Sequence, residues 1–148
     1  MKIVKKAIIP DIISALFILL FVYTATTKLI DHESFRTVLS QSPLIGIKAA
    51  ILSWVLPILE LLTATLLFIP SIRNWGFACS LILMLLFTGY IAYMIFFTPK
   101  LPCSCGGVLA FMTWPQHLIF NIFFTALGAV GLRFTSRNKL FIAINRQS

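Results

Sequence analysis

Four long apolar stretches constrain the fold of this chain more than any other feature of its sequence. They cover residues 7–27, 49–69, 75–97 and 117–132. A helix needs about 20 mostly apolar residues to cross a bilayer, and inside lipid it satisfies its own backbone hydrogen bonds. The sequence therefore predicts an all-α membrane protein, a four-transmembrane-helix bundle in one domain that covers residues 1–148.

Composition excludes an ordinary soluble domain. Apolar residues make up 59% of the chain and charged residues only 11%, whereas soluble domains are about half apolar and about a quarter charged. The net charge of +8 would suggest a nucleic-acid partner in a soluble protein. Here the basic residues gather near the helix ends, where they meet lipid headgroups. We therefore expect a lipid bilayer as partner and no nucleic acid.

The first apolar stretch could also be a signal peptide, because three lysines precede it. However, Pro10 and Asp11 interrupt the stretch early, and the bulky Tyr23 stands where a cleavage site needs a small residue. We expect this segment to remain in the protein as its first helix.

The distribution of Lys and Arg predicts the orientation of the helices in the membrane, because short loops rich in these residues lie on the cytoplasmic side. Placing both termini in the cytoplasm puts eight of them inside: Lys2, Lys5, Lys6, Arg73, Arg133, Arg137, Lys139 and Arg146. It leaves four outside: Lys28, Arg36, Lys48 and Lys100. The loop 99–116 then lies outside and faces the periplasm. We therefore expect a multi-pass protein of a bacterial inner (cytoplasmic) membrane.

The outer loop contains a Cys-Ser-Cys run followed by two glycines. Cys103 and Cys105 can close a disulfide only in a small ring, and strained or exposed disulfides are the ones that tend to exchange. Gly106 and Gly107 allow unusual backbone conformations and the close approach of a partner. We therefore interpret Cys103 and Cys105 as a candidate catalytic pair for thiol–disulfide exchange.

Two alternatives for the cysteine pair stay open. A static bridge would close almost no loop and so would stabilise the fold little. A metal clip could use both thiolates with His117, although no fourth ligand is obvious and no resident metal is assigned. The third cysteine, Cys79, lies near the start of the third helix, about a bilayer thickness away from the loop that holds Cys103 and Cys105. We expect it to act as a small buried apolar residue.

Polar residues descend from the outer loop along the fourth helix. Thr113 and Gln116 have the spacing of a capping box, which predicts that the helix begins there. One face of the helix then carries polar and small residues at spacings of four, four and three: His117, Asn121, Thr125 and Gly128. They could support thiol chemistry or serve only for helix packing.

Glu60 lies near the centre of the second helix, where an ionisable side chain indicates a functional position or a structural ion pair. It shares a helix face with Ser53, Pro57 and Ala64. Lys28 ends the first helix and could reach inward to pair with Glu60. The aromatic residues are typical of interface belts and packing; they could also stack on a quinone, although no spacing requires it.

The chain resembles the MauE/DoxX-like family of redox-associated membrane proteins over nearly its whole length. The resemblance is carried by Lys28-Leu29-Ile30-Asp31, Leu56-Pro57-Ile58-Leu59-Glu60-Leu61, Cys103-Ser104-Cys105-Gly106-Gly107, and His117 with Phe120-Asn121. It implies a four-helix membrane bundle linked to periplasmic thiol chemistry. For MauE it implies maturation of the disulfide-rich subunit of methylamine dehydrogenase, and for DoxX-like relatives electron transfer to quinone.

These observations give one leading hypothesis and two rivals. The chain is interpreted as a membrane thiol–disulfide oxidoreductase that passes electrons between a periplasmic thioredoxin-like partner and the membrane through Cys103 and Cys105. His117, Asn121, Lys28, Glu60, Gly106 and Gly107 are its expected supporting residues. The rivals are a metal-binding or transport protein that uses the same cysteines, and an assembly factor in which they only shape the loop.

Overall fold

The computed structural model describes residues 2–98 and 113–145, with side chains for residues 8–98 and 113–136. The described residues form helices in this order: α1 (Lys2–Ile30), α2 (His32–Ser40), the short 3₁₀ helix η1 (Gly46–Lys48), α3 (Ala49–Phe68), α4 (Arg73–Phe97) and α5 (Trp114–Asn145). Four helical segments are long and apolar enough to cross a membrane: Ile8–Ile30, Gly46–Phe68, Arg73–Phe97 and Trp114–Ser136. The predicted all-α, multi-pass membrane fold is confirmed.

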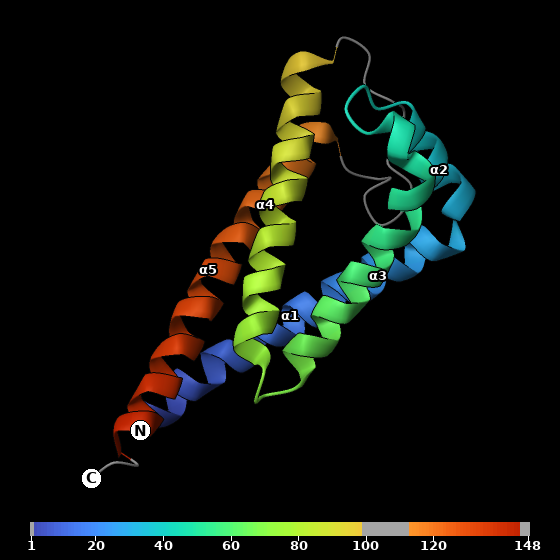
Figure 1. The fold of residues 1–148 in the computed structure, drawn as a ribbon. Coiled ribbons are helices and arrows are strands. Elements are labelled where there is room, and N and C mark those ends of the chain that lie inside the picture. The colour runs from blue at the N-terminus through green and yellow to red at the C-terminus, as the bar shows by residue number, and fades with distance from the viewer. Residues whose placement is uncertain (1, 99–112, 146–148) are drawn as a thin grey trace.

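The long helices pack as two pairs, α1 with α3 and α4 with α5. Further contacts between α3 and α4, and between α1 and α5, close the bundle. Figure 1 shows the two pairs meeting near the turn between α3 and α4 and diverging toward α2. We call these ends of the bundle the turn end and the α2 end. The start of α1 and the end of α5 lie at the turn end (Figure 1).

Aromatic side chains fill the centre of the bundle. Phe17 of α1 is fully buried and meets Phe77 of α4 edge-on, with ring centroids 6.5 Å apart. It also meets Phe124 of α5 edge-on at 5.4 Å, a favoured geometry for aromatic rings. Most large side chains on the outer faces are apolar. That pattern suits a lipid environment, in which the outside of the bundle needs no polar cover.

The fourth transmembrane helix is much longer than the stretch 117–132 predicted from the sequence. It begins at Trp114 and continues to Asn145. The loss of apolar residues after Leu132 predicts an earlier end, but hydropathy marks only the part of a helix that lies in lipid. Arg and Lys, which follow this part, favour helix formation, so the helix continues beyond the hydrophobic segment.

The stretch between the first two membrane helices contains α2, which the sequence interpretation did not identify. Its apolar residues Phe35, Val38 and Leu39 are spaced by three and four, so they share one helix face. That face is half-buried or buried, and α2 packs against α3. An amphipathic helix thus covers the α2 end of the bundle.

Polar contacts hold the turn end together. Arg73 forms an ion pair with Asp11 of α1, and its Nε donates a hydrogen bond to the Leu67 carbonyl at 3.1 Å. Ser136 of α5 donates to the Asn74 side chain at 2.9 Å. Asp11 therefore links α1 to the start of α4.

Gly76 allows α4 to approach α3 closely, and its replacement should weaken the fold. A Cβ atom there would lie 2.8 Å from the backbone nitrogen of Leu67, which cannot rotate away. We expect Gly76→Ala to lower the free energy of unfolding by about 1–3 kcal/mol, as overpacking does. Thermal unfolding in detergent micelles measures the change.

Gly89→Ala is the matched control, because a Cβ at that position on the same helix has no atom within 4 Å. Alanine favours helix over glycine, so this variant should unfold at or slightly above the wild-type temperature. Equal destabilisation by both variants would contradict the close approach at Gly76.

Candidate functional site

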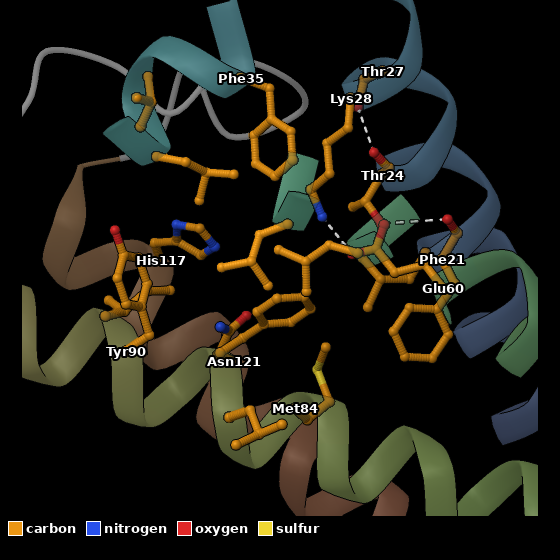
Figure 2. A pocket seen from close by; sticks show the side chains of 18 of the residues that line it. Phe21, Thr24, Thr27, Lys28, Phe35, Glu60, Met84, Tyr90, His117 and Asn121 are labelled. Atoms are coloured by element: carbon orange, nitrogen blue, oxygen red, sulfur yellow. Dashed lines mark hydrogen bonds and ion pairs between the residues drawn. The ribbon is translucent and has the colours of Figure 1, made fainter. Parts of the chain in front are cut away.

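A cavity of about 370 Å³ lies toward the α2 end of the bundle. Its walls are mostly apolar and come from all five α-helices. Ile45, which precedes η1, also contributes to them. The polar side chains on these walls are few: Thr24, Thr27 and Lys28 from α1, Glu60 from α3, Tyr90 from α4, and His117 and Asn121 from α5. Figure 2 shows them around one space. The divergence of the two helix pairs leaves the room for this cavity.

An ion pair between Glu60 and Lys28 forms one wall of the cavity, as expected from the sequence. The Glu60 side chain is 1% exposed and that of Lys28 16%. Thr24 Oγ1 donates to the second carboxylate oxygen of Glu60 at 3.3 Å, so both oxygens are engaged. The Lys28 ammonium also lies 5.0 Å from the ring centroid of Phe87, a cation–π distance. The buried charges therefore compensate each other.

Helical spacing explains why Glu60 points inward. Ser53, Pro57, Glu60 and Ala64 were predicted to share a face of this helix, and all four are buried. The opposite face, with Trp54 and Ile58, is exposed. Glu60 is therefore held inside the bundle by the packing of its neighbours on α3.

The start of α5 places His117 and Asn121 at the cavity. The Gln116 side chain accepts a hydrogen bond from the Thr113 backbone nitrogen at 2.9 Å, which is the predicted return bond of a capping box. The His117 nitrogen donates to the Thr113 carbonyl at 3.0 Å. His117 thus lies in the first turn of α5, and Asn121 lies one turn deeper on the same side (Figure 2).

The lower part of the same stripe serves for packing. Thr125 lies 3.4 Å from the hydroxyl of Thr88 on α4. A Cβ at Gly128 would lie 3.3 Å from the Phe17 ring, so glycine lets α5 approach α1. The stripe therefore has two parts: His117 and Asn121 line the cavity, whereas Thr125 and Gly128 contact other helices.

Cys103, Cys105, Gly106 and Gly107 lie outside the described residues. The described positions on either side are Thr98, which follows α4, and Thr113, which precedes α5. Cys79 is half-buried near the start of α4. About 27 Å of helix separates it from Phe97, given a rise of 1.5 Å per residue.

Two contributions to the cavity were missed from the sequence. Thr24 bonds Glu60 and precedes Lys28 by four residues on α1. That spacing places the two on one helix face, and it was a usable signal. The α2 helix adds Phe35 and Leu39 to the walls, and their spacing was the signal for an amphipathic helix.

The arrangement suits an uncharged ligand that is largely apolar and carries a polar group. Its walls are mostly apolar, its two buried charges cancel, and His117 and Asn121 offer hydrogen bonds. Within residues 2–98 and 113–145, no three His, Cys, Asp or Glu side chains come together as a metal site would require.

A protein-family model matches most of the chain. The family described as "Methylamine utilisation protein MauE" matches residues 6–134. This span includes the first three membrane segments, the Cys-Ser-Cys run and all but the last two residues of the fourth segment. No curated protein and no solved structure matches the chain.

Loss of one partner of the buried ion pair should destabilise the bundle more than loss of both. Glu60→Leu leaves the Lys28 charge uncompensated, and breaking a buried pair costs about 3–5 kcal/mol. The double variant Lys28→Met with Glu60→Leu replaces both charges by apolar groups, which is often nearly neutral. Among the wild type, Glu60→Leu and the double variant, Glu60→Leu should therefore have the lowest transition temperature in thermal unfolding in micelles.

The Asp11–Arg73 pair is the control, because the Asp11 side chain is 61% exposed. Asp11→Asn should cost less than about 1 kcal/mol, as for other exposed pairs. A double variant of Lys28 and Glu60 that is less stable than Glu60→Leu would contradict the compensation of charge.

Proposed function

Because this chain belongs to the MauE family of methylamine utilisation proteins, we propose that it is a membrane thiol–disulfide redox protein. It exchanges disulfides between Cys103 and Cys105 and a thioredoxin-like partner in the periplasm. In this proposal both termini are cytoplasmic and the protein lies in a bacterial inner membrane. Its role is to help form disulfides in a subunit of methylamine dehydrogenase.

The observation that carries the proposal is the gathering of Lys28, Glu60, His117 and Asn121 around one cavity. His117 lies four residues after Thr113, where the segment with the cysteines rejoins the described chain. The turn end, in contrast, has polar contacts that join helices, such as the pair of Asp11 with Arg73. Groups suited to thiol chemistry are thus collected on the side of the bundle to which the Cys-Ser-Cys loop is attached.

The proposed exchange follows the chemistry of thiols. A thiolate of the reduced partner attacks one sulfur of the Cys103–Cys105 disulfide, forming a mixed disulfide and releasing the other cysteine as a thiolate. The second partner thiolate then attacks the mixed disulfide. The partner leaves with a disulfide, and Cys103 and Cys105 retain the two electrons. His117, in the first turn after the loop, is placed to take or return a proton.

Trapping of a mixed disulfide tests the exchange. Cys103→Ser and Cys105→Ser are each made with Cys79→Ser, so that a single thiol remains. Without a resolving cysteine, at least one variant should accumulate an adduct with a periplasmic thioredoxin-like protein. Non-reducing gels detect the adduct, dithiothreitol should release it, and mass spectrometry identifies the partner.

The matched control keeps Cys79 and carries serine at both loop positions, and it should form no adduct. Absence of an adduct from both single-thiol variants would contradict the proposed exchange. Stoichiometric copper or zinc in reduced wild-type protein, lost on Cys103→Ser, would favour a metal-binding role instead.

Thiol labelling tests the orientation separately. After mild reduction, a membrane-impermeant maleimide added to spheroplasts should modify Cys103 and Cys105 in the Cys79→Ser variant. The variant that retains only Cys79 should be modified only after detergent is added. Loop cysteines that react only in disrupted membranes would place the loop in the cytoplasm and overturn the proposed topology.

A further inference from the structure

Two helix ends at the turn end carry basic residues without acidic ones. The basic residues are Lys2, Lys5 and Lys6 of α1 and Arg133, Arg137 and Lys139 of α5. Residues 1–10 and 133–148 contain no Asp or Glu. Asp11, which follows the first stretch, is already paired with Arg73. The other acidic residues belong to the start of α2 and to the cavity, so the turn end keeps a net positive charge.

The start of α1 and the end of α5 lie next to each other at similar depth. The two helices are in contact, and both ends lie at the turn end (Figure 1). Asp11 of α1 binds Arg73, and Ser136 of α5 binds Asn74. Arg73 and Asn74 are the first two residues of α4. The two basic groups are therefore aligned with the same level of the bundle.

On α1 the basic positions lead into an apolar stripe that faces lipid. Ile9, Ile12 and Leu16 follow Lys5 at spacings of four, three and four, which places them on one helix face. All three are exposed and lie in a membrane-spanning segment. Lys2 precedes Lys5 by three residues and shares this face. A phosphate near these lysines would thus have lipid-facing helix surface directly below it.

On α5 the same arrangement recurs. Val130, Ala126 and Phe123 precede Arg133 at spacings of three, four and three, and all are exposed. Arg133 is itself exposed and forms no hydrogen bond or ion pair with the residues that the structure describes. Arg137 follows it by four residues on the same face. Like charges at this spacing repel each other along a helix, and a bound anion would remove that repulsion.

The two stripes flank one seam of the bundle. The helices form a closed ring in which α1 contacts α3 and α5, and α4 completes the ring between those two. The outward faces of neighbouring helices meet along the seam between them. A molecule that matches this seam has two anionic groups at the level of the headgroups and apolar chains that run along the helices. Phosphates suit the basic groups, because arginine binds them through paired hydrogen bonds.

We propose that the seam between α1 and α5 at the turn end binds one phospholipid whose headgroup carries two phosphates, as cardiolipin does. One phosphate binds Arg133 and Arg137, and the other binds the lysines at the start of α1. The acyl chains lie along the two exposed stripes. Basic sites between membrane helices bind such headgroups. The bound lipid joins α1 to α5 and does not involve the cysteines.

Native mass spectrometry of the full chain in detergent micelles tests the site. Cardiolipin is compared with phosphatidylglycerol, which carries one phosphate, at equal phosphate concentration. The wild type should retain one cardiolipin per chain and bind it at least about tenfold more tightly than phosphatidylglycerol, because two basic groups act on one molecule.

The variant Arg133→Gln with Arg137→Gln should bind cardiolipin about tenfold more weakly or worse, since each basic residue near an anionic lipid contributes about a factor of five. Without lipid it should unfold at the wild-type temperature, because Arg133 forms no ion pair within the described residues. Added cardiolipin should raise the unfolding temperature of the wild type more than that of the variant.

Arg36→Gln with Lys48→Gln is the matched control. It removes the same number of positive charges from exposed positions toward the α2 end, and it should bind cardiolipin like the wild type. Equal loss of affinity in both double variants would show attraction to the charge of the whole chain and would overturn the site.

Two further outcomes would overturn the proposal. One is equal affinity for the two lipids per phosphate, and the other is unchanged cardiolipin binding by Arg133→Gln with Arg137→Gln. Inorganic pyrophosphate has two phosphates but no acyl chains, so it separates a lipid site from a site for free phosphate. It should not displace cardiolipin at equal concentration, and displacement would contradict the role of the apolar stripes.

Discussion

The absence of water inside a bilayer makes it costly to leave a buried charge without a partner in the bundle. Glu60 meets that constraint with Lys28 and Thr24, which both come from α1. The ion pair therefore fixes the rotation of α1 and α3 about their own axes, because only one face of each helix carries these side chains. The apolar residues around them can exchange neighbours more freely, since lipid and core are equally apolar.

The two ends of the bundle solve the packing problem differently. At the turn end, Gly76 and Gly131 let helices approach until backbone and aromatic atoms touch. Toward the α2 end the helix pairs diverge (Figure 1), and large aromatic and aliphatic side chains only partly fill the gap. The same four helices thus provide a rigid base and a cavity, and the polar residues of the cavity lie on helices that the base holds in place.

Sequence reasoning succeeded where a single residue or period decided the outcome. The four apolar stretches gave the membrane helices, and the cost of an ionisable Glu60 in lipid pointed to its pairing with Lys28. It failed where several elements act together. The cavity depends on how far two helix pairs diverge, which no local pattern encodes. The amphipathic α2 and the length of α5 were missed because hydropathy reports contact with lipid and not helix formation.

The length of α5 gives the protein an arm on the side of the turn end. Its 32 residues measure about 48 Å at the rise of an α-helix, whereas the hydrocarbon layer is about 30 Å thick. The backbone beyond Ser136, where the apolar segment ends, continues as helix to Asn145. A fluorescent protein fused to the C-terminus would consequently stand off the headgroups on a stiff spacer, and its distance from the membrane plane would report the tilt of α5.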